Sequence, residues 1–128
     1  MKRIIYIITL LLLFIPQCMR GESAKITFDN SLHNFEAVAE EGGCVTHNFT
    51  FTNTGDSPLI IMDVSTNCGC TTAQYPQAPI AAGNQGTIVI TFDPKGNPGE
   101  FAKEIIVKSN ASKRRTKLRI KGYVIPQQ

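Results

Sequence analysis

Apolar and polar residues alternate with a period of two along most of the chain after residue 24, and no stretch keeps the 3.6-residue period of an amphipathic helix. The segment 45–52 is the clearest example, and its inward face is Val45, His47, Phe49 and Phe51. Two later segments place Ile88, Ile90 and Phe92, and then Leu118 and Ile120, on one face. The pattern predicts strands at 25–29, 45–52, 59–64, 87–92, 101–107 and 117–124.

Turn-forming residues separate these strands, most clearly the Asn, Gly, Asp and Pro clusters at 53–58 and 93–99. About seven short strands rich in β-branched and aromatic residues, each burying one face, are typical of an antiparallel β-sandwich. We therefore predict an all-β fold. Residues 24–128 are enough for one domain with one core, and we predict a single domain there.

Residues 1–23 have the pattern of a signal peptide. Lys2 and Arg3 precede an apolar run at 4–15, which is too short to span a bilayer as a helix, and Pro16 closes it. Cleavage and lipidation before Cys18 would make a bacterial lipoprotein, whereas ordinary cleavage near Gly21 would leave a soluble chain. We expect export to the periplasm or cell envelope of a bacterium, with a membrane anchor only if Cys18 is lipidated.

Charge is nearly balanced after the leader, with ten basic and nine acidic residues beyond position 23. Seven of these bases lie between Lys108 and Lys121. They fit the solvent face of a last hairpin, where lysine discourages edge-to-edge aggregation, or alternatively a patch for a polyanion or anionic lipid. No aromatic residues interleave with them, so we expect no nucleic-acid partner.

Three cysteines follow the leader, Cys44, Cys68 and Cys70, and an odd number leaves one unpaired or joined to another chain. A bridge from Cys44 to Cys68 or Cys70 closes a long loop and is the stronger structural staple, which we favour. A Cys68–Cys70 bridge is short, and Gly69 permits the tight bend that it needs. Such a bridge suits a labile, redox-active disulfide.

Metal binding is a further alternative, with Cu(I) the ion that two thiolates suit best. The candidate ligands are Cys68, Cys70, Met62 and His47. His47 lies on the apolar face of its strand and Met62 shares a face with Ile60 and Val64, so both are first interpreted as core residues. His33 lies in a turn-like segment and is expected to be solvated.

Catalytic motifs are absent from the sequence: it contains no G-x-S-x-G elbow, no H-E-x-x-H helix and no phosphate-binding glycine loop. Its acidic residues are scattered in turns rather than paired. We therefore predict a protein that is not an enzyme, with no catalytic residue and no cofactor.

Several motifs resemble the bacterial domain-of-unknown-function family numbered 1573 over residues 26–124. The N-x-G-D-x-P-L-x-I turn begins at Asn53, the C-G-C-T motif spans 68–71, and the closing L-x-I-x-G motif begins at Leu118. The F-x-K-x-I-x-V-x-S-N strand runs from Phe101 to Asn110. The resemblance implies an immunoglobulin-like sandwich related to major sperm protein and Hydin-type domains, and implies no activity.

The favoured hypothesis is therefore an exported, non-catalytic immunoglobulin-like module that binds another envelope or secreted component through a strand edge or an end loop. The alternative is a periplasmic thiol-redox or copper-handling protein that uses the loop Cys68-Gly69-Cys70. The oligomeric state is left open.

Overall fold

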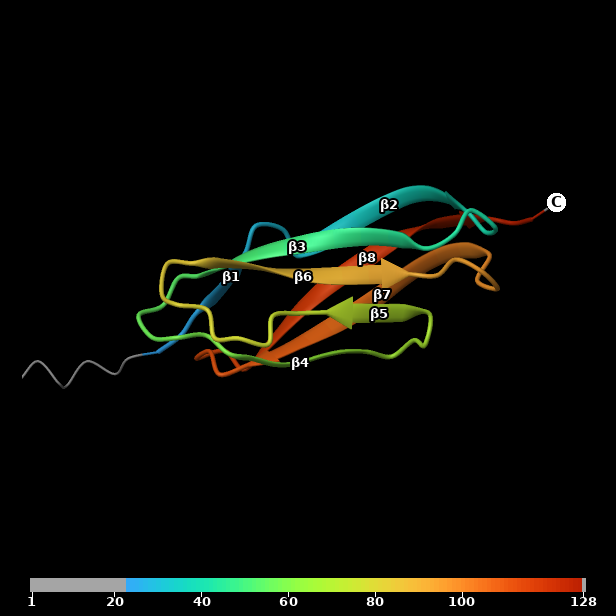
Figure 1. Cartoon of the computed structure of the whole chain (residues 1–128). Coiled ribbons are helices and arrows are strands. Elements are labelled where there is room, and N and C mark those ends of the chain that lie inside the picture. The colour runs from blue at the N-terminus through green and yellow to red at the C-terminus, as the bar shows by residue number, and fades with distance from the viewer. Residues whose placement is uncertain (1–22, 128) are drawn as a thin grey trace, which may run out of the picture.

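The computed structural model describes residues 23–127, which form eight strands in two facing sheets (Figure 1). The strands are β1 (Ile26–Phe28), β2 (Leu32–Ala39), β3 (Val45–Asn53), β4 (Ile61–Thr66), β5 (Thr71–Gln74), β6 (Gln85–Phe92), β7 (Gly99–Ser109) and β8 (Arg115–Ile125). Residues 1–22 of the predicted signal peptide 1–23, Cys18 among them, lie outside the described residues. No helix long and apolar enough to cross a membrane occurs within residues 23–127.

One sheet has the strand order β1-β3-β6-β5 and the other the order β2-β8-β7-β4. The strand pairs are antiparallel except for β2 and β8, which run parallel. Two four-stranded sheets packed face to face confirm the predicted all-β, immunoglobulin-like sandwich.

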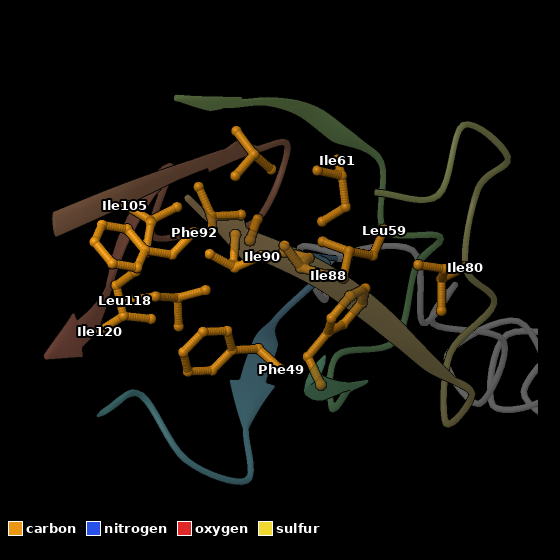
Figure 2. Close-up of a cluster of buried hydrophobic side chains, with 14 of the residues drawn as sticks. Phe49, Leu59, Ile61, Ile80, Ile88, Ile90, Phe92, Ile105, Leu118 and Ile120 are labelled. Atoms are coloured by element: carbon orange, nitrogen blue, oxygen red, sulfur yellow. The ribbon is translucent and has the colours of Figure 1, made fainter. Parts of the chain in front are cut away.

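The core lies between the sheets and includes the residues that the alternation placed inward, together with Leu59 and Ile80 from outside the strands (Figure 2). Phe49, Ile88, Ile90 and Phe92 from the first sheet are at most 1% exposed, and Leu118 and Ile120 from the second are fully buried. The strands β3, β6 and β8 therefore contribute every second side chain to one apolar layer, as the period of two requires.

Two strands were not predicted. In β2 the alternation is broken by a bulge between Asn34 and Ala37, where Glu36 adopts a left-handed conformation with φ 61°. Because β2 pairs in parallel with β8, no hairpin turn marks it either. The other missed strand, β5, has four residues of which Thr71 alone is buried, so its sequence carries no apolar pattern.

Met62 was expected in the core and this was wrong: its side chain is 63% exposed. A register shift between Ile61 and Asp63 puts Met62 at a bulge in β4. Ile61 and Val64 are thereby both buried although they are three residues apart. Beyond a bulge of this kind, each side chain points to the opposite face of the sheet from the one that a strict period of two predicts. The alternation in the sequence does not reveal the bulge.

The two ends of the sandwich carry different features (Figure 1). One end, called here the disulfide end, holds the loops 40–44, 67–70 and 93–98, and the chain terminates near it. Hydrogen bonds join these loops: Asp93 N–H donates to the backbone oxygen of Cys70 at 2.8 Å, and Gly96 N–H donates to the side-chain Oε2 of Glu40 at 3.0 Å. The opposite end holds the β7–β8 hairpin and the segment that leads into β1, which meet where Ser112 N–H donates to Ala24 O at 3.1 Å.

Candidate functional site at the disulfide end

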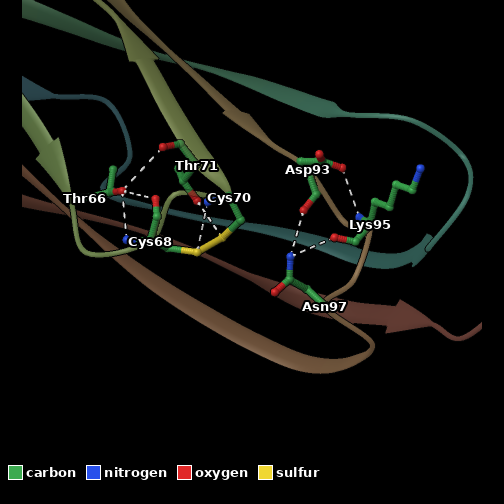
Figure 3. Close-up of a disulfide and its surroundings, with 7 residues drawn as sticks. All are labelled: Thr66, Cys68, Cys70, Thr71, Asp93, Lys95 and Asn97. Atoms are coloured by element: carbon green, nitrogen blue, oxygen red, sulfur yellow. Dashed lines mark hydrogen bonds between the residues drawn. A yellow bond between two sulfur atoms is a disulfide. The ribbon is translucent and has the colours of Figure 1, made fainter.

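A disulfide joins Cys68 to Cys70 in the loop where the chain passes from β4 in one sheet to β5 in the other (Figure 3). The two Cα atoms are 5.1 Å apart, well within the range that a disulfide accepts. The bend at Gly69 does not require a glycine, because the φ of Gly69 is not positive and a Cβ there would meet no atom within 4 Å. The bridge from Cys44 that we favoured is therefore wrong. Among the described residues Cys44 is the free cysteine, and it is exposed.

The loop is also held by hydrogen bonds that do not involve the S–S bond (Figure 3). Thr66 Oγ1 donates to Cys68 O at 2.9 Å, and Thr71 N–H donates to the same oxygen at 3.2 Å. Cys68 N–H in turn donates to Thr66 Oγ1 at 3.3 Å. These contacts hold the Cys68 backbone from the strands on either side of the loop.

Ring size limits what the disulfide adds to stability. On the chain-entropy model, closing three residues contributes about 1.6 kcal/mol, whereas the expected Cys44–Cys68 loop of about 25 residues would have contributed about 3.5 kcal/mol. A sandwich with a continuous apolar core does not depend on a contribution of this size. The observed disulfide therefore stabilises the fold less than the expected bridge from Cys44 would have done.

The strand beside the disulfide loop has an unpaired edge. β4 pairs only with residues from Ile105 to Ser109 of β7, because its chain leaves the sheet after Thr66. β7 begins at Gly99, and its first six residues, 99–104, pair with β8 on one side and with no described strand on the other.

A shallow cavity of about 260 Å³ lies along this edge and is lined by Asn67, Cys68, Ala102, Lys103 and Glu104. Lys103 is half-buried and in phase with the inward residues Phe101 and Ile105. No functional role of Lys103 was predicted from the sequence. The signal that could have revealed it is a lysine at an inward position of an otherwise apolar face.

The four candidate metal ligands do not form one site. Met62 lies on the outer face of β4, and His47 lies on β3, which is in the other sheet. In the part of the chain from 23 to 127, no group of three or more His, Cys, Asp or Glu residues could hold a metal ion. Cys68 and Cys70 are joined to each other, so their sulfurs are not free thiolates in this state.

His47 packs against a residue that the sequence had placed in solvent. His33 lies in β2 and is half-buried, and its ring stacks on that of His47 with 3.7 Å between centroids. The Phe49 ring makes an edge contact with His47 at 4.6 Å. Burial lowers the pKa of His47 below its ordinary value, and the charge of His33 lowers it further.

The motif at Asn53 and the motif ending at Asn110 are structural. Asn53 is fully buried, and its Nδ2 donates to Ser57 O at 2.8 Å and to Ile80 O at 2.9 Å. Asn110 Oδ1 accepts from Ile60 N–H at 2.7 Å and Nδ2 donates to Pro58 O at 3.1 Å. These amides connect turns to strands, so this part of the signature specifies the fold.

The basic residues lie mainly on the outer face of β8 and at its hairpin. Lys117, Arg119 and Lys121 point outward and alternate with buried Leu118 and Ile120. Arg119 is paired with Glu104 of β7 at 3.0 Å. Near the hairpin, a cavity of about 440 Å³ is bordered by Lys108, Arg114, Arg115 and exposed Met62.

Comparison with solved structures identifies the same fold in proteins of low sequence identity. A protein of unknown function from Porphyromonas gingivalis W83 matches with a TM-score of 0.73 at 16% identity, over 87% of this chain and 51% of that chain. The chain thus spans about half the length of that protein. The seventh PapD-like domain of human CEP192 matches with a TM-score of 0.67 at 14% identity, over 90% of this chain and 95% of that domain.

The Escherichia coli chaperone DraB matches with a TM-score of 0.54 at 15% identity, over 80% of this chain and 56% of that chain. No curated protein shows significant sequence similarity to this chain. A family model described as "Protein of unknown function (DUF1573)" matches residues 26–124, which include both sheets and the disulfide loop. The chain belongs to this DUF1573 family.

Proposed function

We propose that this protein is an exported, non-catalytic module that binds another protein of the bacterial cell envelope by accepting one of its strands. The observation that carries the proposal is the unpaired edge of β7 at residues 99–104. An edge of this kind presents backbone N–H and C=O groups in a row, and an extended segment of a partner adds to it by main-chain hydrogen bonds. The chaperone DraB has the same fold, which is in keeping with a role in binding proteins.

Side chains at this edge define the partner segment. Phe101 lies on the inner face and Glu100 on the outer face of β7. A partner strand that continues the line of β4 would place apolar side chains beside Phe101 and a basic side chain beside Glu100. We therefore infer an extended segment with alternating apolar and basic residues.

Selection from a library of displayed ten-residue peptides tests this binding mode. Enriched peptides are expected to have alternating apolar and basic residues. When bound, they should protect backbone amides within residues 99–104 from hydrogen exchange. A charge at the edge, Ala102→Lys, should weaken binding at least tenfold, since lysine on an edge strand opposes pairing. The matched control Ser65→Lys, on the exposed face of β4, should not. Peptides that bind without protecting residues 99–104 would overturn the proposal.

Export and anchoring need their own measurement. Residues 1–30 fused to a reporter that is active only outside the cytoplasm should give activity. Incorporation of labelled palmitate that is lost in Cys18→Ser would establish the lipid anchor, and release of unlabelled protein cleaved near Gly21 would establish the soluble form.

A further inference from the structure

The two sulfurs of the disulfide have different surroundings. Cys70 packs against the core cluster, and the Thr71 hydroxyl lies 3.6 Å from its Sγ. Cys68 instead lines the cavity along the β7 edge, together with Lys103 and Glu104. A reagent that enters this cavity therefore meets Cys68, whereas Cys70, also partly buried, packs on its inner side against the core and does not line the cavity.

The environment of Cys68 favours a negatively charged sulfur. Cys70 N–H donates to Cys68 Sγ at 3.2 Å, and the cavity is also lined by Lys103. The carboxylate of Glu104 borders the same cavity but is paired with Arg119 at 3.0 Å. A hydrogen-bond donor and an ammonium group stabilise a thiolate relative to a thiol, which makes it both a better nucleophile at neutral pH and a better leaving group.

Reduction would leave the loop in place. The bonds from Thr66 Oγ1 and Thr71 N–H to Cys68 O, and from Asp93 N–H to Cys70 O, hold both cysteines without the S–S bond. With one residue between them, the two thiols would stay close enough to close again. Opening this bridge would therefore leave the loop in its place, whereas opening a bridge between distant strands would release one strand from the other.

From these contacts we propose that Cys68–Cys70 is a thiol–disulfide exchange site that oxidises a dithiol. One thiolate of the dithiol attacks Cys68 Sγ, the Cys68–Cys70 bond breaks, and its electron pair leaves on Cys70 Sγ, which takes a proton from water. The second thiolate of the dithiol then attacks the sulfur already bound to Cys68. This forms the disulfide of the substrate and releases Cys68 as a thiolate beside Lys103. Two electrons pass from the dithiol to the protein, and strand binding at β7 is not needed for the step.

The test uses the full-length chain carrying Cys18→Ser and Cys44→Ser, so that Cys68 and Cys70 are its only cysteines. Under native conditions about 1 mM dithiothreitol should reduce the bridge completely, and alkylation followed by mass spectrometry measures the reduced fraction. Circular dichroism should show the sheet unchanged. Trapping with oxidised glutathione after partial reduction should place glutathione on Cys68 in roughly tenfold excess over Cys70.

Two variants separate an exchange site from an accessible but passive disulfide. Lys103→Gln should slow the reaction at Cys68 about threefold. Lys25→Gln, a lysine at the opposite end of the sandwich, should leave the rate unchanged. A bridge that resists dithiothreitol until the protein unfolds, glutathione divided equally between the two sulfurs, or equal rates for both lysine variants would overturn the proposal. Because the reagents are small molecules, a failed peptide selection would not affect this result.

Discussion

His33 on β2 and His47 on β3 stack face to face across the two sheets, with their ring planes 9° apart. Burial lowers the pKa of His47 below its ordinary value of 6.5, and the charge of His33 lowers it further. The folded protein therefore binds a proton at His47 less readily than the unfolded chain does. This contribution to stability is full above about pH 6.5, falls as the pH drops below that value, and levels off once folded His47 is also protonated.

We accordingly expect a lower midpoint of thermal unfolding at pH 5 than at pH 7.5, measured by circular dichroism. His47→Gln removes the group whose pKa is shifted, and His33→Gln removes the charge facing it, so each should reduce this difference. Carboxylates that titrate in acid also contribute to this difference in unfolding midpoint. Their contribution is the same in the variants and in the unmodified protein, so comparing the two isolates the effect of the histidines. An unchanged difference in His47→Gln would contradict the expectation.

Asn53 is the buried polar residue on which three segments converge. Besides its two Nδ2 bonds, its Oδ1 accepts from Gly55 N–H at 3.1 Å and from Lys25 N–H at 3.4 Å. Asn53→Ala leaves these partners unsatisfied, and we expect a loss of about 3 kcal/mol in the free energy of unfolding by urea. Asn48→Ala, at an exposed position of the same strand, should change it by no more than about 0.5 kcal/mol. Equal losses in the two variants would show that the amide network is not the cause.

The central strands could be predicted from sequence because burial of one face requires an apolar residue at every second position, such as Phe49, Ile88 and Leu118. The alternation fails where a bulge changes the facing, as at Glu36 and Met62, and where a short edge strand buries almost nothing, as in β5. The predicted pairing of the cysteines was wrong for another reason. Loop entropy ranks the possible bridges, but the crossover between sheets after Thr66 decides which sulfurs meet.

Gly122 on β8 lies where two elements approach closely. A Cβ there would come within 2.8 Å of Glu36 O, in the β2 bulge, and 2.9 Å of the Phe101 ring. The backbone oxygen cannot move aside without disturbing the bulge, so Gly122→Ala should destabilise the protein by about 1–3 kcal/mol in urea unfolding. Gly69→Ala is the matched substitution in open space, with no atom within 4 Å, and should change stability by no more than about 0.5 kcal/mol. The reverse order of the two effects would contradict the packing at the bulge.

Cys44 is exposed at the disulfide end and, within residues 23–127, has no bonded partner. An accessible unpaired thiol forms a disulfide with a second copy of the chain on oxidation, so air oxidation of the purified protein carrying Cys18→Ser should produce a dimer that reductant dissociates. Cys44→Ser should abolish this dimer on a non-reducing gel and change the free energy of unfolding by no more than about 0.5 kcal/mol, because the side chain is not part of the core. The Cys68–Cys70 bridge should persist in the variant, as peptide mapping would show. A dimer that survives Cys44→Ser would instead involve the Cys68–Cys70 pair, and its sensitivity to Cys68→Ser would identify the sulfur that exchanges.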